Sequence, residues 1–124
     1  MKKLGILLLL VAIIISCKND KNLSIKDFKT GTFETFLDNS DATSTATRNK
    51  FLQIETYNSK KDTFEIKWKS NFEYILTKTH PKSKLDSTRF FVKITGIKGN
   101  SYTFKANYEG SNFKQTGTVT KISE

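Results

Sequence analysis

Hydrophobic and polar residues alternate along most of the chain after residue 28, and this alternation predicts β-strands. In the clearest run, 63–69, the side chains of Phe64, Ile66 and Trp68 fall on one face and charged side chains on the other. Successive side chains of a strand point to opposite faces, so a period of two is typical of a half-buried strand. The runs of this kind are 28–37, 51–57, 63–69, 72–76, 89–97, 102–108 and 113–122. They predict about seven strands.

The segments between these runs are short and rich in turn-forming residues. The sequence Lys98-Gly99-Asn100-Ser101 favours a tight hairpin, and Gly117 is expected to interrupt or bulge the last strand. Two stretches are predicted as loops: 38–47, which has no large apolar residue, and 77–87, which holds the only proline and the only histidine. Sequential strands with hairpin connections favour an antiparallel meander.

We therefore expect an all-β fold in which residues 28–124 form a single domain. Closure of the meander into a small barrel, or a curled sheet, protects the edge strands from pairing with other chains. An open β-sandwich is the alternative architecture.

The first seventeen residues have a different pattern from the rest. Lys2 and Lys3 are followed by a stretch, 4–15, that is apolar apart from Gly5. A helix that crosses a bilayer needs roughly 20 apolar residues, and this stretch is shorter. We therefore expect residues 1–16 to form the helix of an export signal peptide rather than a permanent transmembrane anchor.

The end of this signal, Ile14-Ile15-Ser16-Cys17, resembles the lipobox of bacterial lipoprotein precursors. The resemblance implies cleavage between Ser16 and Cys17 and lipid attachment at Cys17, with acyl chains such as palmitate. Two acyl chains hold a protein stably on a membrane, whereas one gives only reversible binding. Residues 17–27 are then the lipidated cysteine and a polar tether. Lys18, in place of aspartate, favours the outer membrane of the cell envelope, on either its periplasmic or its surface face.

The charge of the chain is +9, and it limits the partners that we expect. Removal of Lys2 and Lys3 leaves 19 basic against 12 acidic residues, a net charge of +7. A basic surface attracts anionic polymers, although scattered lysines are also typical of an ordinary solvated surface. Export from the cytoplasm argues against nucleic acid as a partner. We expect the membrane as a partner through the lipid anchor, with an anionic envelope polymer or a protein as further candidates and the oligomeric state open.

Catalytic and metal-binding motifs are absent from the sequence. Neither the nucleophile elbow, nor the zinc-protease motif, nor a glycine-rich phosphate loop occurs. Metal sites need several ligands, and the chain has one histidine, His80, and one cysteine. We therefore expect no enzyme activity, no metal and no cofactor. A carboxylate pair drawn from Glu55, Glu65 and Glu73 is the one catalytic alternative.

Four residues are candidates for ligand contact: Arg48, Trp68, Tyr74 and Arg89. Arg48 and Arg89 are the only arginines, and arginine combines a planar set of donors with stacking on aromatic rings. Packing of an arginine beside Trp68 in the core is the alternative role. We expect a binding module for a small or anionic ligand. The alternative is a protein-interaction or inhibitor domain that presents loops 38–47 and 77–87.

Several segments of the domain together resemble a group of small lipoproteins from Bacteroidota and flavobacteria. The segments are 28–33 (FKTGTF), 47–49 (TRN), 53–55 (QIE), 68–74 (WKSNFEY) and 99–102 (GNSY). The resemblance covers most of residues 28–122 and implies a cellular location more than an activity. The meander is also similar in architecture to lipocalin-like small barrels, but a shared architecture does not define a function.

Overall fold

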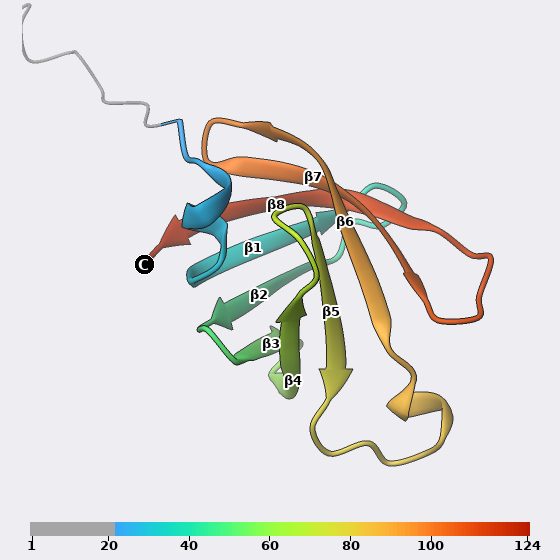
Figure 1. Ribbon diagram of the computed structural model, residues 1–124. Coiled ribbons are helices and arrows are strands. Elements are labelled where there is room, and N and C mark those ends of the chain that lie inside the picture. Colours follow the sequence, from blue (N-terminus) through green and yellow to red (C-terminus); the bar gives the residue numbers. More distant parts are fainter. Residues whose placement is uncertain (1–21) are drawn as a thin grey trace, which may run out of the picture.

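Eight antiparallel strands close into a barrel in the computed structural model of the chain, which describes residues 22–124 (Figure 1). Each strand pairs with the next one along the chain, and β1 also pairs with β8. The predicted all-β meander and its closure are therefore confirmed. The expected signal helix, with Ser16 and Cys17, lies outside the described residues. Within residues 22–124, no helix is long and apolar enough to cross a membrane.

Short connections join the strands, and two of the segments outside the strands form 3-10 helices. These helices are η2 (Ile25–Phe28), which precedes the barrel, and η3 (Leu85–Ser87), which lies between β5 and β6. The strands are β1 (Gly31–Leu37), β2 (Thr43–Arg48), β3 (Leu52–Tyr57), β4 (Lys60–Trp68), β5 (Glu73–Lys78), β6 (Phe90–Lys98), β7 (Ser101–Tyr108) and β8 (Gln115–Ser123).

The strand that exceeds the predicted number is β2, which occupies much of the segment predicted as a loop. Its inward-facing residues are Ser44, Ala46 and Arg48, and none of them is a large apolar residue. Hydrophobic alternation cannot reveal such a strand. Instead, β2 is held by antiparallel pairing with both of its neighbours, β1 and β3. The other predicted loop, 77–87, is a strand only as far as Lys78.

One end of the barrel is closed by the segment that leads into β1. Phe28 of η2 is fully buried, and Leu23 and Ile25 pack against the core. The backbone N–H of Leu23 donates to the carbonyl of Gly99 (2.9 Å), and Lys121 Nζ donates to the carbonyl of Asp27 (2.6 Å). In Figure 1 this closed end also holds the C-terminus. The other end carries the connections 38–42, 58–59, 79–89 and 109–114, and we call it the open end.

Gly117 does not bulge β8, contrary to the sequence-based expectation. β8 pairs with β1 and β7 without interruption at Gly117, and the register shifts instead fall between Thr32 and Phe33 and between Ile94 and Gly96. A Cβ atom at Gly117 would lie 2.3 Å from the carbonyl oxygen of Phe36 and 3.0 Å from the Phe104 ring. Glycine is therefore required here because β1 and a core ring approach the backbone closely.

We predict that Gly117→Ala destabilises the barrel by about 2 kcal/mol or more, because a backbone carbonyl must move to admit the methyl group. Urea unfolding followed by circular dichroism measures this loss. Gly96→Ala is the matched control, since its Cβ would meet only the Thr103 hydroxyl, at 3.3 Å. It should change the free energy of unfolding by less than about 1 kcal/mol. Equal losses in the two variants would contradict the steric explanation.

Candidate functional site

A chamber of about 470 Å³ lies inside the barrel and reaches the open end. All eight strands contribute side chains to its lining, and Ser40 and Ala42 of the β1–β2 connection stand at its mouth. Small-molecule sites are typically concave spaces of roughly 300–1,000 Å³ with mixed polar and apolar linings. The chamber has the size and shape of such a site.

The floor of the chamber is formed by Arg48, the last residue of β2, which is only 5% exposed. Its Nε donates to Gln53 Oε1 (2.8 Å), and its Nη1 donates to the carbonyl of Phe28 (2.6 Å). Its Nη2 donates to the hydroxyls of Tyr74 (3.3 Å) and Tyr102 (3.2 Å). One side chain thus connects η2, β3, β5 and β7.

The positive charge of Arg48 is balanced by dipoles and aromatic rings. No carboxylate of the described chain forms a salt bridge with it. The guanidinium carbon lies 4.4 Å from the ring centre of Phe33, 4.9 Å from that of Tyr74 and 6.0 Å from that of Trp68. Cations are attracted to the faces of aromatic rings, most strongly when water is excluded. The arrangement keeps a buried guanidinium without a buried counter-ion.

Two tyrosine hydroxyls complete the network on the floor. The hydroxyls of Tyr74 and Tyr102 lie 2.8 Å apart, within hydrogen-bonding distance. Burial raises the pKa of Tyr74 well above its ordinary value, so the phenol stays protonated. Each tyrosine accepts from Arg48, and one of the two donates to the other. The closed end is therefore fixed by polar bonds as well as by apolar packing.

A series of polar side chains continues from the floor along β3, which forms part of the chamber wall. Gln53 Nε2 donates to Glu55 Oε1 (3.0 Å), and Glu55 pairs across the strands with Asp62 of β4. Burial raises the pKa of Glu55, and Asp62 adds to this shift. The hydrogen bond from Gln53 and the charges of Arg48 and Lys78 oppose the shift. The Glu55 carboxyl thus titrates above its ordinary range while it faces the chamber.

The structure brings three of the four candidate ligand contacts together and separates the fourth. Arg48 and Tyr74 line the chamber, and Trp68 packs against Tyr74 with ring centres 4.8 Å apart. Arg48 and Tyr74 thus belong to the floor of the chamber rather than to its mouth, and Trp68 packs against Tyr74 without lining the chamber. Arg89 is exposed and binds Glu109 through two hydrogen bonds of 2.7 and 2.8 Å. It does not line the chamber.

The carboxylates named as a catalytic alternative do not converge. Only Glu55 lines the chamber, whereas Glu65 is exposed and lies 3.7 Å from Lys67. The second acid in the lining is Asp62, which the sequence analysis did not single out. His80 is exposed, with Nδ1 3.1 Å from the Thr79 hydroxyl. Residues 22–124 contain no group of three or more potential metal ligands.

Sequence reasoning missed Gln53 as part of the site. It lies next to Arg48 across the β2–β3 pairing and links the floor to Glu55. The signal that could have revealed it is the spacing of Gln53, Glu55 and Tyr57 at every second position of a strand. Such spacing places all three on one face.

No protein-family model, no curated protein and no solved structure matches this chain. Its function is therefore argued from the geometry of the chamber.

We predict that Arg48→Lys destabilises the barrel by about 3 kcal/mol. A single ammonium group cannot reach all four acceptors, and each buried acceptor left without a donor costs about 1–3 kcal/mol. Urea unfolding measures the loss. Arg89→Lys is the matched control, because its ion pair is exposed, and it should leave the urea midpoint almost unchanged. Similar losses in both variants would show that Arg48 does not hold the closed end.

We predict that Glu55→Gln stabilises the protein more at pH 7 than at pH 4. The folded pKa of Glu55 lies above the ordinary value of 4.5. Between these two values the folded state binds more protons than the unfolded state, so the contribution of Glu55 to stability is lost as pH rises through the folded pKa. Urea unfolding at both pH values tests this. Glu65→Gln, on the outside of β4, should show a smaller change, and an equal change in both variants would contradict the burial argument.

Proposed function

We propose that this protein is an exported, lipid-anchored protein of the cell envelope whose barrel binds a small molecule in its chamber. The observation that carries the proposal is the chamber itself. Protein interiors are normally close-packed, and an unfilled space costs stability because the atoms that line it lose contacts. Retention of such a space in a domain of this size favours a role for it.

Large apolar side chains that could have filled the chamber lie outside it. Thr35 faces the chamber, while the adjacent Phe36 points outward and is 42% exposed. Ser44 of β2 pairs with Thr35 and also lines the chamber. If Phe36 faced inward in place of Thr35, its ring would fill part of the chamber. The small polar residues inside therefore support a bound ligand.

The place of the tether gives the proposed orientation on the membrane. Leu23 is attached to the closed end through its bond to Gly99. If Cys17 carries lipid, residues 18–22 separate it from the barrel, and five extended residues span at most about 18 Å. The closed end then lies near the bilayer and the open end faces away from it. A ligand would enter from the aqueous compartment.

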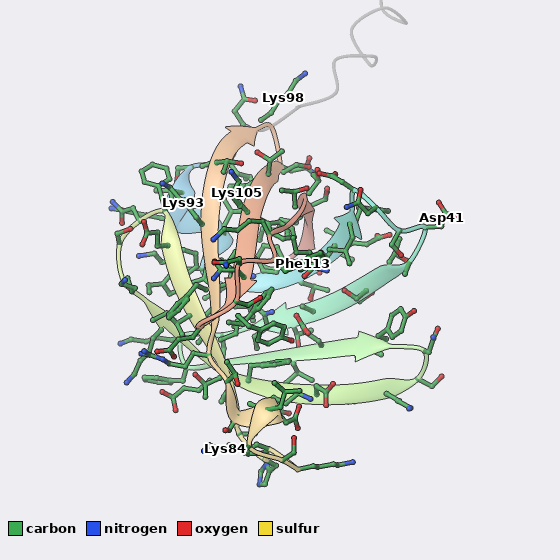
Figure 2. The ribbon with its side chains drawn as sticks, turned by 90° about the vertical axis from the view of Figure 1, so that its right-hand side faces the viewer. Asp41, Lys84, Lys93, Lys98, Lys105 and Phe113 are labelled. Carbon is green, nitrogen blue, oxygen red and sulfur yellow. The ribbon has the colours of Figure 1, made fainter. Side chains whose placement is uncertain are left out.

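A second candidate function is recognition of another protein by the open-end loops. Leu85 in the β5–β6 connection is 83% exposed, and Phe113 in the β7–β8 connection is 72% exposed. Figure 2 labels Phe113 and Lys84, the neighbour of Leu85, and shows them apart on the molecule. Exposed apolar residues mark a contact site where they form a contiguous patch, so each of these loops would contact a partner separately.

The outer face of β6 and β7 is the candidate surface for an anionic polymer. Lys93 and Lys105 pair directly across these strands and are exposed, and Lys98 lies at the start of the following hairpin turn (Figure 2). Adjacent like charges repel each other, and an anionic partner would relieve that repulsion.

We predict that the uncharged fluorophore N-phenyl-1-naphthylamine binds the chamber saturably at one site per chain. The protein for this titration begins at residue 18, because residues 22–124 contain the eight strands of the barrel and the core cluster described above, and the apolar stretch 4–15 is then absent. Ser44→Phe fills the chamber and should weaken binding at least tenfold. Thr45→Phe places the same ring on the outer face of β2 and should leave the affinity unchanged.

Two results would contradict the proposed function. One is the absence of saturable binding by the native chain. The other is equal binding by the two phenylalanine variants, provided that circular dichroism shows both to be folded.

A further inference from the structure

The lining of the chamber is divided into a polar wall and an apolar wall. The polar wall comes from β8, β1, β2 and β3, which are neighbours in the barrel, and its polar residues include Thr35, Ser44, Glu55 and Gln115, beside the apolar Leu37 and Val119. The apolar wall comes from β4 to β7 and is formed mainly by Phe64, Leu76, Phe90, Val92 and Phe104, with Asp62 of β4 as its charged residue. The two walls face each other across the chamber. A ligand that contacts both must itself have a polar and an apolar part.

The polar wall offers hydrogen-bonding groups that the protein does not use. Within residues 22–124, the hydroxyls of Thr35 and Ser44 and the side-chain amide of Gln115 form no hydrogen bond with another protein group. Glu55 accepts from Gln53 through Oε1 only. In the described part of the chain no fully buried polar side-chain atom lacks a partner, so these free groups are accessible, and they open onto the chamber. They are available to a ligand.

β3 turns polar side chains toward the barrel interior and an apolar side chain toward solvent, the reverse of the usual arrangement. Gln53, Glu55 and Tyr57 face the chamber, while Ile54 points outward and is 36% exposed. Burial of an isoleucine side chain is favourable, and a one-residue register slip would turn Ile54 inward. The hydrogen bond between Arg48 and Gln53 holds the observed register. Polar groups are thus presented to the chamber at the expense of apolar burial.

The apolar wall continues beyond the chamber. A second cavity of about 530 Å³ shares Phe64, Leu76, Phe90 and Tyr108 with the chamber and extends to Leu85 in the β5–β6 connection. The rest of its lining is mostly polar and includes Lys78, Asp86 and Glu109. β5 and β6 pair only from Glu73 with Lys93 to Leu76 with Phe90, so the strands separate beyond that point toward the open end. The apolar track therefore runs from the barrel interior to a space under the connection 79–89.

The connection above this track is held in place by an ion pair. Lys78 Nζ lies 2.8 Å from Asp86 Oδ1 and 3.8 Å from Asp62 Oδ1. Lys78 is thus engaged by two carboxylates, and four of the five N–H groups of Arg48 bond to protein acceptors. Both cations therefore already have protein partners, and the carboxylates of Glu55 and Asp62 disfavour an anionic ligand in the chamber.

We propose that the ligand is an elongated amphiphile with an uncharged, hydroxyl-type head group. This inference rests on the proposed function of the chamber. The head group bonds to the polar wall at Thr35, Ser44 and Glu55. The hydrocarbon chain lies along the apolar wall, and its far end reaches the space under the connection 79–89, next to Leu85.

The test is displacement of N-phenyl-1-naphthylamine from the chain that begins at residue 18. The competitors at pH 7 are 1-decanol, decanoate and decylammonium, which share a chain length and differ in head-group charge. We expect 1-decanol to displace the fluorophore at a concentration at least tenfold lower than either decanoate or decylammonium does. Thr35→Val removes one hydroxyl without a change in shape and should weaken the binding of 1-decanol several-fold. Thr45→Val, on the outer face, should leave the binding of 1-decanol unchanged.

The length of the ligand is tested separately with Leu85→Ser. Leu85 is largely exposed, so the variant should fold. It should weaken the binding of 1-decanol more than that of 1-hexanol, because the chain of 1-hexanol does not reach the second cavity. Equal displacement by the three head groups, a preference for decanoate, or no effect of Thr35→Val would overturn the inference while fluorophore binding still stood. Absence of fluorophore binding would instead contradict the proposed function itself.

Discussion

The structure depends on one buried interaction, the set of hydrogen bonds made by Arg48. A small barrel must be closed at one end if the other is to hold a chamber, and here four elements meet at a single guanidinium. Apolar packing of Phe28 against Tyr102, with ring centres 5.2 Å apart, supports the same closure. A buried charge is costly unless its environment compensates it, and aromatic faces and oxygen acceptors supply that compensation. The polar floor is therefore explained by the closure of the barrel, whether or not a ligand contacts it.

This closure leaves the chamber toward the other end of the barrel. The cap formed by η2 lies at the closed end, core residues such as Leu76, Val92 and Phe104 also line the chamber, and small or polar inward residues such as Thr35 and Ser44 leave space beside them. Gln53 links the two regions, since it accepts from Arg48 and donates to Glu55. A change at the floor would therefore alter the polar wall as well. The basic outer face of β6 and β7 is independent of this linkage and contributes charge rather than shape.

Much of the fold could be predicted from the sequence, but little of the site could. The strands with apolar alternation, such as β4 with Phe64, Ile66 and Trp68, follow directly from a period of two. β2 could not be found in this way, because its inward residues are small or polar where they border the chamber. Arg48, Trp68 and Tyr74 were identified by residue type. Their convergence, and the exclusion of Arg89, depend on strand order and register, which local pattern does not determine.

We propose that the chamber holds a small molecule in the cell. Native mass spectrometry of the protein recovered from the cells that produce it is the decisive measurement, after cleavage at a protease site placed after Asn22 so that the barrel stays intact. The account predicts one reproducible added mass per chain, that of a small molecule, which disappears when Ser44→Phe fills the chamber. A mass equal to that of the polypeptide alone, in the native chain and the variant alike, would contradict the account.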